Sequence, residues 1–444
     1  MNSIEQFRKF ADSTKYLYVG SDIYSRMISD FLSFTEGRPV YIIADENTMD
    51  AAGNRFLQFC RDESVPVAGL HRFSAEPELT SDYENVIVLK DKLSGNYCVP
   101  VAVGSGTIND LVKRTAYELN RPYAVVATAG SVDGYASDGA ALLYNGLKQT
   151  LPCSAPCFIC ADTAVLSKAP REMTSAGYAD LLAKNPAGAD WLIADTVGLD
   201  FPEPDVWSMI QGNLPEWTGS PENLLKGDSD AFIRLFTGLN ATGFAMQYMK
   251  RSRPASGAEH LMSHIWEMDG HTFRGKHVSH GFKVAIGSLA SIALMETVLS
   301  MKPDGLQIDS ALEQWPSFEE KLAAVEKHFT GTGAIDDLLK INREKYISHD
   351  ELKTRLFSLK DNWGVMAEKV FGHLIPYRRY RDLLERAGCP VVPEAIGLTV
   401  EKVMETYYPA QLMRNRYTIL DLAVETASLE KACSRIAESR LYLK

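Results

Sequence analysis

The stretch Val101-Ala-Val-Gly-Ser-Gly-Thr-Ile-Asn-Asp110 decides the fold class of this chain. A β-branched run ends at Gly104, and the chain passes through Ser105 and Gly106 into a segment with helical character. A strand that turns directly into a helix is the repeating unit of a parallel sheet with right-handed crossovers. Glycines at the turn let the backbone approach a phosphate, which the helix N-terminus attracts. The pattern is not G-x-G-x-x-G, so an ordinary strand-to-helix turn stays equally open.

The flanking sequence extends this unit into a domain. Further β-rich runs occur at Val40–Asp45, Val86–Leu89 and Tyr123–Ala127, with helix-like segments between them. After Pro170 these runs vanish and apolar residues recur at helical spacing. We therefore predict an α/β, Rossmann-like N-terminal domain over residues 1–170 and an all-α C-terminal domain over residues 171–444. Helical spacing is found at Val284–Leu299, Phe318–His328, Ile335–Ile341, Leu352–Leu359 and Ile419–Ile436.

Composition narrows the function class and the compartment. The 444 residues carry 46 Lys and Arg against 57 Asp and Glu, a net charge of −11. This balance argues against a nucleic-acid or anionic-membrane surface. The most apolar stretch, Val284–Leu299, is interrupted by polar residues and is interpreted as a buried helix, not a membrane span. Seven cysteines are sparse, as in a reducing cytoplasm. Cys153, Cys157 and Cys160 cluster, and we favour buried structural thiols over a metal site.

Two polar groups follow strands of the predicted sheet. Thr128-Ala-Gly-Ser-Val-Asp-Gly134 places hydroxyls and a carboxylate at a strand end. The alternative interpretation is a turn with side-chain caps. Asp45 ends the strand Val40–Asp45, where a carboxylate can accept hydrogen bonds from an adenosine ribose. It could equally cap the next helix, because Asp-Glu-Asn-Thr is good capping sequence.

The third feature is a concentration of histidines. Five of the nine lie within a short segment: His260, His264, His271, His277 and His280. His260 and His264 are four residues apart, on one face of a predicted helix. Far upstream, Asp180 sits in an apolar helical stretch, where an acid is costly unless it is paired or bound to metal. Two imidazoles and one carboxylate suit a divalent metal with open positions. We interpret His271 and His277 as solvent-facing.

These motifs together resemble the glycerol-1-phosphate dehydrogenases of the bacterial AraM type. That family lies within the dehydroquinate synthase-like and iron-containing alcohol dehydrogenase superfamily. The resemblance covers roughly residues 15–300 and implies a dehydroquinate synthase-like fold. It also implies NAD(P)H-dependent interconversion of dihydroxyacetone phosphate and sn-glycerol 1-phosphate, a small phosphorylated substrate. The motifs are Gly104–Asp110, Thr128–Gly134, Gly177-Tyr-x-Asp180, Ser256-Gly-x-Glu-His260-x3-His264 and His280-Gly281-x-x-Val284.

The resemblance also implies residue roles. The metal ligands would be Asp180, His260 and His280. Asp133, Asp180 and His264 would contact the substrate and carry catalysis. The middle serine of Gly-Ser-Gly departs from the usual triple glycine of the family and leaves the phosphate contacts less defined. The cofactor contacts would be Asp45, Gly104, Ser105, Gly106, Thr107, Ile108, Thr128, Ser131 and Ser137.

Several choices stay open at this stage. The bacterial branch suggests nickel and the archaeal branch zinc, while iron also fits the ligand set. Asp45 would repel a 2′-phosphate, so NAD(H) is expected over NADP(H). The family suggests a homodimer. Alternatives are a polyol dehydrogenase, dehydroquinate synthase-like carbocycle formation and a non-catalytic sensor. The candidate cations for a substrate phosphate are Lys148, Arg251, Arg253 and Lys283.

Overall fold

The computed structural model describes residues 3–7, 9–144, 147–301 and 306–444, and of 147–148 the backbone alone. Its contacts divide the chain into two compact units. Unit 1 comprises Met1–Leu181 and Asn213–Ser252, and unit 2 comprises Leu182–Gly212 and Arg253–Lys444. The boundary predicted at residue 170 follows the change in composition. The contact-based units differ from it because α12 (Ser229–Met249) returns to pack against β1.

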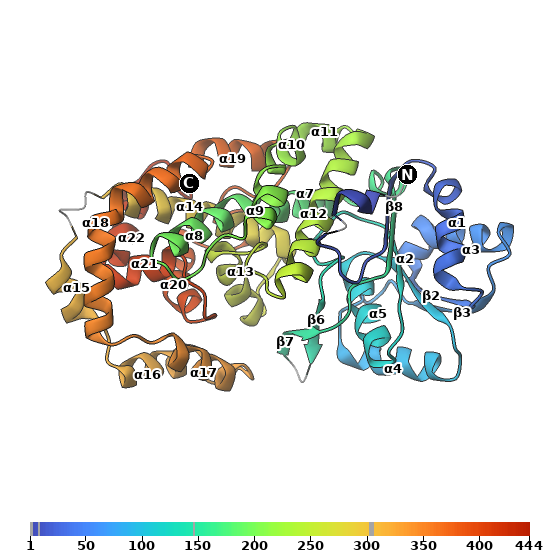
Figure 1. Ribbon diagram of the computed structural model, residues 1–444, viewed down its shortest axis with the longest axis horizontal. Helices are drawn as coiled ribbons and strands as arrows, with labels where there is room; N and C mark the ends of the chain where they lie inside the picture. Colours follow the sequence, from blue (N-terminus) through green and yellow to red (C-terminus); the bar gives the residue numbers. More distant parts are fainter. Residues whose placement is uncertain (1–2, 8, 145–146, 302–305) are drawn as a thin grey trace. The chain divides into compact units, whose positions relative to one another are not determined.

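Unit 1 contains a six-stranded parallel sheet in the order β1-β8-β5-β4-β2-β3 (Figure 1). Its central strands are buried over their whole length, which explains their continuous β-branched runs. This confirms the predicted Rossmann-like architecture. The strands are β1 (Tyr16–Gly20), β2 (Val40–Asp45), β3 (Val67–Phe73), β4 (Val99–Gly104), β5 (Ala124–Ala127) and β8 (Phe158–Asp162).

The order of the strands reverses beside β2. The chain leaves β2 through α3 to the edge strand β3, then returns to β4 on the other side of β2 and continues away to β5. The carboxyl ends of β2 and β4 therefore flank a topological switch point, the place where open α/β sheets bind ligands. Ile43 pairs with Ala102, so the ends of the two strands lie at the same level.

The helices of unit 1 connect and cover these strands. A separate antiparallel hairpin, β6 (Gly139–Tyr144) with β7 (Leu147–Pro152), follows β5 (Figure 1). The helices are α1 (Ile23–Thr35), α2 (Glu46–Thr48), α3 (Asn54–Asp62), α4 (Tyr83–Ser94), α5 (Gly106–Glu118), α6 (Thr163–Leu166), α7 (Arg171–Leu182), α10 (Leu214–Thr218), α11 (Pro221–Leu225) and α12.

One strand prediction was wrong. Val86–Leu89 belongs to helix α4 rather than to the sheet. Val86, Leu89 and Leu93 are buried at helical spacing, while Ile87 and Val88 between them are exposed. The 3.6-residue period of burial outweighed the β-propensity of a short apolar run.

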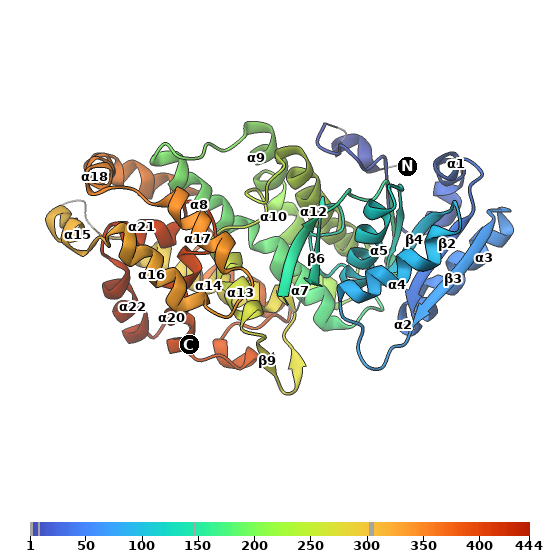
Figure 2. The same cartoon turned by 90° about the horizontal axis from the view of Figure 1, so that it is seen from below.

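Unit 2 is helical apart from a small hairpin, β9 (Thr272–Phe273) with β10 (Lys276–His277). Figure 2 shows α13 beside α14, and α16 beside α17. The predicted helix over Ile419–Ile436 is in fact two helices that break at Ala427, whose φ is positive. The helices are α8 (Lys184–Thr196), α9 (Pro204–Gln211), α13 (Ala258–Met268), α14 (His280–Leu299), α15 (Ile308–Gln314), α16 (Phe318–Phe329), α17 (Ile335–Lys345), α18 (His349–His373), α19 (Tyr377–Arg386), α20 (Val400–Gln411), α21 (Ile419–Glu425) and α22 (Leu429–Glu438).

Helix α14 forms the centre of unit 2. Among the described residues it is the one helix long and apolar enough to cross a membrane by length and composition. However, 89% of its apolar window is buried inside the protein. Its neighbours include α13, α19, α20 and α22. The apolar stretch is therefore a core helix, as its interrupting polar residues indicated.

Helix α7 packs against the loop after β5 with no room for a side chain. A Cβ atom on Gly177 would lie 1.8 Å from the carbonyl oxygen of Gly130. We expect Gly177→Ala to lower the free energy of unfolding by at least about 1–3 kcal/mol, because backbone atoms must move to relieve the overlap. Chemical denaturation would measure the loss.

Gly364→Ala is the matched control for this prediction. Gly364 lies in helix α18, and a Cβ atom there would meet nothing within 4 Å. This substitution is expected to be neutral or to stabilise the chain by about 0.5–1 kcal/mol, because alanine favours helix. An equal change in the free energy of unfolding of Gly177→Ala and Gly364→Ala would contradict the interpretation that close packing requires glycine at position 177.

Candidate active site and metal centre

Three of the predicted cofactor segments lie at one edge of the sheet. Asp45 ends β2, Gly104 ends β4, and Thr128 follows β5. These strands are neighbours in the sheet, and the N–H of Thr128 donates to the carbonyl oxygen of Gly104 at 3.1 Å. The parallel arrangement therefore brings together residues that are widely separated in the sequence, at the topological switch point.

The glycine-rich turn leads directly into α5. Ser105 is the N-cap residue but makes no side-chain capping bond. The first bond within the helix runs from the N–H of Asn109 to the carbonyl of Ser105. The preceding N–H groups, on Gly106, Thr107 and Ile108, are those a helix N-terminus offers to an anion. A Cβ atom on Gly104 would lie 2.6 Å from Ile108, so the turn requires glycine there.

Asp45 caps a helix, the alternative role considered for it. Its Oδ1 accepts from the N–H of Thr48 at 2.7 Å, and the N–H of Asp45 donates to the Thr48 hydroxyl. This capping box fixes the carboxylate at the carboxyl end of β2. The cap uses Oδ1, so capping and ribose binding are compatible roles for the carboxylate.

The loop after β5 is held by its own hydrogen bonds. Thr128 and Ser131 are buried, and the hydroxyl of Tyr135 donates to the carbonyl of Ala129 at 2.8 Å. The backbone N–H of Asp133 donates to Oδ2 of Asp180 at 3.0 Å. Within unit 1 this bond connects the loop to helix α7, and it places two residues predicted to contact substrate next to each other.

A buried lysine that sequence analysis missed organises the same loop. Lys113 of α5 is fully buried, and its ammonium donates to the carbonyls of Gly134 and Gly139 at 2.7 and 2.9 Å. It also contacts Ser137 at 3.3 Å and pairs with Asp110 at 3.5 Å. Ser137 is therefore engaged within the loop rather than turned out of it. The sequence did not predict this role for Lys113, because its main partners are backbone carbonyls, which no side-chain pattern reveals.

Three histidines of unit 2 form one cluster. The ring centroids of His260 and His280 are 5.3 Å apart, and those of His264 and His280 are 6.0 Å apart. His260 and His264 lie on α13, and His280 begins α14, which packs beside it. The other two histidines lie elsewhere: His271 contacts the carbonyl of Ile396, and His277 is exposed on β10.

Each of the two predicted ligand histidines has its own carboxylate partner. Nδ1 of His260 lies 2.8 Å from Oε1 of Glu259, and Nδ1 of His280 lies 2.8 Å from Oε1 of Glu267. A carboxylate bound to Nδ1 selects the tautomer with the proton on that nitrogen and leaves Nε2 to bind a metal. These two glutamates were missed by sequence analysis. Glu267 could have been found by spacing, since it lies seven residues after His260 and three after His264 on one helix.

The start of helix α13 is fixed by two buried acids. The N–H of Ala258 donates to Oδ2 of Asp190 at 2.7 Å, and the N–H of Gly257 donates to Oε1 of Glu259 at 2.6 Å. Burial, with the nearby charge of Glu259, raises the pKa of Asp190 to about 7. Burial would also raise the pKa of Glu259, but hydrogen bonds from His260 and Gly257 outweigh it and lower that pKa. A Cβ atom on Gly257 would lie 2.4 Å from Asp190, so only glycine fits.

The predicted ligand triad is divided between the two units. His260 and His280 lie together in unit 2, with ring centroids 5.3 Å apart, while Asp180 belongs to unit 1. Asp180 is fully buried in the last turn of α7. One carboxylate oxygen and two imidazole nitrogens form a donor set that suits a divalent transition metal. The residues present therefore fit the metal that the sequence predicted.

His264 lies beside the two histidines of this triad in a different electrostatic setting. Its Nδ1 lies 3.3 Å from Oε2 of Glu267. Desolvation lowers the pKa of His264 to about 4, with Glu267 acting in the opposite direction. The ring is therefore neutral near pH 7.

The candidate phosphate-binding cations differ in their surroundings. Lys283 is buried one turn after His280, and its Nζ lies 3.2 Å from Oε1 of Glu267. Arg253 is buried and donates to the carbonyl of Asp190, with Asp200 as a charged partner. Arg251 is exposed. The side chain of Lys148 lies outside the described part of the chain. Among the three candidates whose side chains the structure describes, Lys283 is the cation at the histidine cluster.

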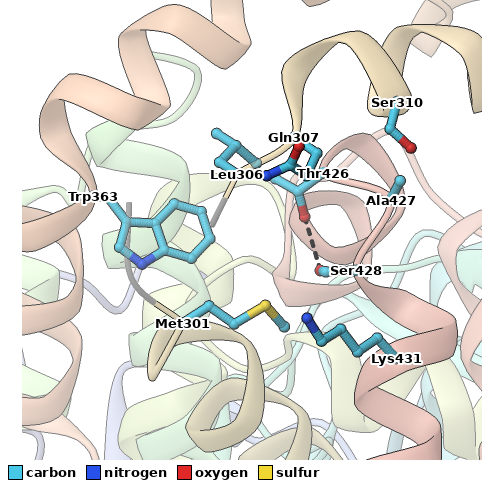
Figure 3. Close-up of a pocket in the computed structure, with 9 residues that line it drawn as sticks. All are labelled: Met301, Leu306, Gln307, Ser310, Trp363, Thr426, Ala427, Ser428 and Lys431. Atoms are coloured by element: carbon cyan, nitrogen blue, oxygen red, sulfur yellow. Dashed lines mark hydrogen bonds between the residues drawn. The ribbon is translucent and has the colours of Figure 1, made fainter. Parts of the chain in front are cut away.

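A cavity of about 130 Å³ in unit 2 is separate from this cluster (Figure 3). Met301, Trp363 and Lys431 are among its lining residues, and the hydroxyls of Thr426 and Ser428 lie 2.8 Å apart within it. It contains none of the predicted site residues. The cysteine cluster lies in unit 1, where Cys153 and Cys160 are buried, as expected for structural thiols, and Cys157 is half-buried.

Comparison with known proteins identifies relatives of this chain. The profile of a family described as iron-containing alcohol dehydrogenase matches residues 20–170. A relative named glycerol-1-phosphate dehydrogenase (NAD(P)+) from Geobacillus thermodenitrificans is 29% identical over 410 residues, 92% of either chain. One of the same name from Picrophilus torridus is 31% identical over 284 residues, which cover 63% of this chain and 76% of the relative.

Solved structures show the same fold at low identity. A probable glycerol dehydrogenase from Sinorhizobium meliloti superposes with a TM-score of 0.59 at 12% identity, over 95% of this chain and 97% of that one. This similarity confirms the predicted dehydroquinate synthase-like architecture. The sequence relatives add the family. The chain belongs to the glycerol-1-phosphate dehydrogenases, oxidoreductases within the iron-containing alcohol dehydrogenase-like superfamily.

Proposed function

We propose that this protein interconverts dihydroxyacetone phosphate and sn-glycerol 1-phosphate by NAD(P)H-dependent, metal-dependent hydride transfer. One observation carries the proposal: the rings of His260 and His280 lie with their centroids 5.3 Å apart, and each has its own glutamate partner. Both histidines have Nδ1 committed to a carboxylate, which supports ligation through Nε2. The names of the sequence relatives supply the substrate and the cofactor class.

The nicotinamide cofactor would bind at the carboxyl edge of the sheet. The N–H groups of Gly106, Thr107 and Ile108 at the start of α5, with Gly104 and Ser105 before them, would hold the pyrophosphate. Asp45 would accept hydrogen bonds from the adenosine ribose, and its charge favours NAD(H) over NADP(H). Thr128, Ser131 and Ser137 are proposed nearer the nicotinamide. The bound cofactor supplies the hydride, while these residues align it.

The metal, when bound, supplies Lewis-acid polarisation of the substrate C2 oxygen. Nickel, zinc and iron all suit the donor set. Asp133 and Asp180 would orient the substrate, and their direct hydrogen bond keeps the two residues in register. His264 lies beside the two predicted ligand histidines, with Nδ1 3.3 Å from Oε2 of Glu267, and its Nε2 would accept the proton of the C2 hydroxyl when the alcohol is oxidised and return it in the reverse direction.

The setting of the enzyme is part of the proposal. We propose a cytoplasmic homodimer that acts on a free phosphorylated metabolite. The acidic balance of the chain argues against an anionic membrane surface, and the homodimer rests on the family resemblance alone. We also propose that residues 1–170 bind the dinucleotide and residues 171–444 supply most of the metal and substrate contacts.

The first test of the activity is NADH oxidation with two ketones. The protein is stripped of metal and reloaded separately with nickel, zinc or iron. Dihydroxyacetone phosphate should be reduced only by metal-loaded protein, and its kcat/KM should exceed that for dihydroxyacetone by about 10–100-fold or more, the value of a charged hydrogen bond or two. Equal rates with the free ketone would indicate a polyol dehydrogenase. Metal binding without oxidation of NADH by either ketone would favour the synthase-like chemistry.

Substitution of a proposed ligand, His280, and of the proposed acid–base residue, His264, should separate metal binding from proton transfer. His280→Ala is expected to lose metal and activity together, with affinity falling by more than the 10–100-fold typical of an outer-sphere partner. His264→Ala should keep the metal but lose about 10²–10⁴-fold in kcat, because it removes the acid–base group. Metal content by elemental analysis and steady-state kinetics measure the two effects.

His277→Ala is the control for both variants. His277 is exposed on β10 and should leave metal content and kcat unchanged. Retained stoichiometric metal in His280→Ala would overturn the ligand assignment. An unchanged kcat in His264→Ala would remove that residue from the reaction.

A further inference from the structure

One buried carboxylate connects three groups of the histidine cluster. Oε1 of Glu267 lies 2.8 Å from Nδ1 of His280 and 3.2 Å from Nζ of Lys283, and Oε2 lies 3.3 Å from Nδ1 of His264. The side chain of Glu267 is 6% exposed. It lies on α13, whereas His280 and Lys283 lie on α14. Glu267 thus joins the two helices at the point where the cluster forms.

Such a carboxylate is costly to bury unless donors compensate it. The donors here come from a proposed metal ligand, a proposed proton acceptor and a buried cation, and both carboxylate oxygens are in use. A group with this many partners at one place restricts the ring rotation of His280 and His264 together. It also keeps the proton of each ring on Nδ1, because that nitrogen faces an acceptor.

We propose that Glu267 is the positioning residue of the metal centre. It holds His280 in the orientation and tautomer that present Nε2 to a divalent metal, and it keeps His264 and Lys283 beside that ligand. The inference rests on the proposed function, because it takes His280 as a ligand. Glu267 itself would not touch the metal or the substrate, since its two oxygens contact the outer nitrogens of the rings.

An amide cannot replace this carboxylate. Glutamine has one acceptor oxygen and one donor nitrogen in place of two acceptors. With its oxygen toward His280 and Lys283, the NH2 group of Glu267→Gln would face the Nδ1–H of His264. In the opposite orientation, the NH2 group would face His280 and Lys283. Either way the substitution is nearly isosteric but leaves a donor facing a donor.

The test compares Glu267→Gln with Glu296→Gln as a matched control. Glu296 lies on α14 and also loses hydrogen bonds on substitution, because it accepts from the N–H of Tyr377 and the hydroxyl of Tyr442, both at 2.8 Å. Neither tyrosine belongs to the histidine cluster, so Glu296→Gln reports a loss of structure alone. The affinity of each variant for zinc and for cobalt is measured by competition with a chelator. The absorption spectrum of the cobalt-loaded protein reports the ligand geometry.

Glu267→Gln should bind either metal about 10–100-fold more weakly than the parent chain and show an altered cobalt spectrum. Glu296→Gln should match the parent in both readouts. Parental affinity and an unchanged spectrum in Glu267→Gln would overturn the inference, as would an equal loss in both variants. A parent chain that binds no divalent metal would overturn the proposed function and, with it, this inference. A different result would overturn the inference and leave the proposed function standing. In that result, the parent chain is active with the expected metal and substrate, and Glu267→Gln binds metal as the parent does.

A measurement on the unsubstituted protein keeps the inference testable if Glu267→Gln does not fold. Histidine labelled with ¹⁵N in the zinc-loaded parent chain reports which ring nitrogen carries the proton. The ring signals of His280 are assigned through its own backbone resonances, because a His280 variant would lose zinc and shift the neighbouring ring signals as well. A protonated Nδ1 and a zinc-bound Nε2 in His280 are expected. A zinc-bound Nδ1 or an Nε2–H tautomer would overturn the positioning role.

Discussion

The site depends on imidazole rings that each present one particular nitrogen to a shared point. A free imidazole rotates and exchanges tautomers, so the protein must supply acceptors for the other nitrogen. Glu259 and Glu267 do so for His260 and His280, at 2.8 Å in each case. Burying two carboxylates costs free energy that their N–H donors offset. The need for an acceptor at each Nδ1 therefore accounts for the two buried glutamates on α13.

A buried carboxylate also accepts hydrogen bonds at the start of α13. Asp190 accepts from the first N–H of α13 and, through its other oxygen, from the first N–H of α21, both at 2.7 Å. One buried acid therefore caps two helices. Through it the C-terminal helices fix the place where the ligand-bearing helix begins. This gives the C-terminal part of the chain a structural role in unit 2, beyond the motifs that suggested the family.

Sequence patterns predicted the central strands of the sheet well, for identifiable reasons. The strands at Val40–Asp45 and within Val99–Gly104 are buried on both faces, so their β-branched runs are unambiguous. Val86–Leu89 failed because four apolar residues fit either period, and only the exposure of Ile87 and Val88 reveals the helix. The break at Ala427 was also invisible, since its positive φ carries no glycine signal.

The sequence by itself determined the α/β class, the glycine-rich turn, and the candidate ligands Asp180, His260 and His280. These follow from local patterns of burial and from the donor chemistry of single residues. Only the tertiary structure identified Glu267, Glu259 and Lys113 as the groups that hold the site. Glu267 contacts His280 and Lys283 on another helix, and Lys113 contacts backbone carbonyls outside its own helix, and no local pattern encodes such partners. The order β4-β2-β3, which creates the switch point, was likewise decided by packing, because strand adjacency depends on long-range contacts.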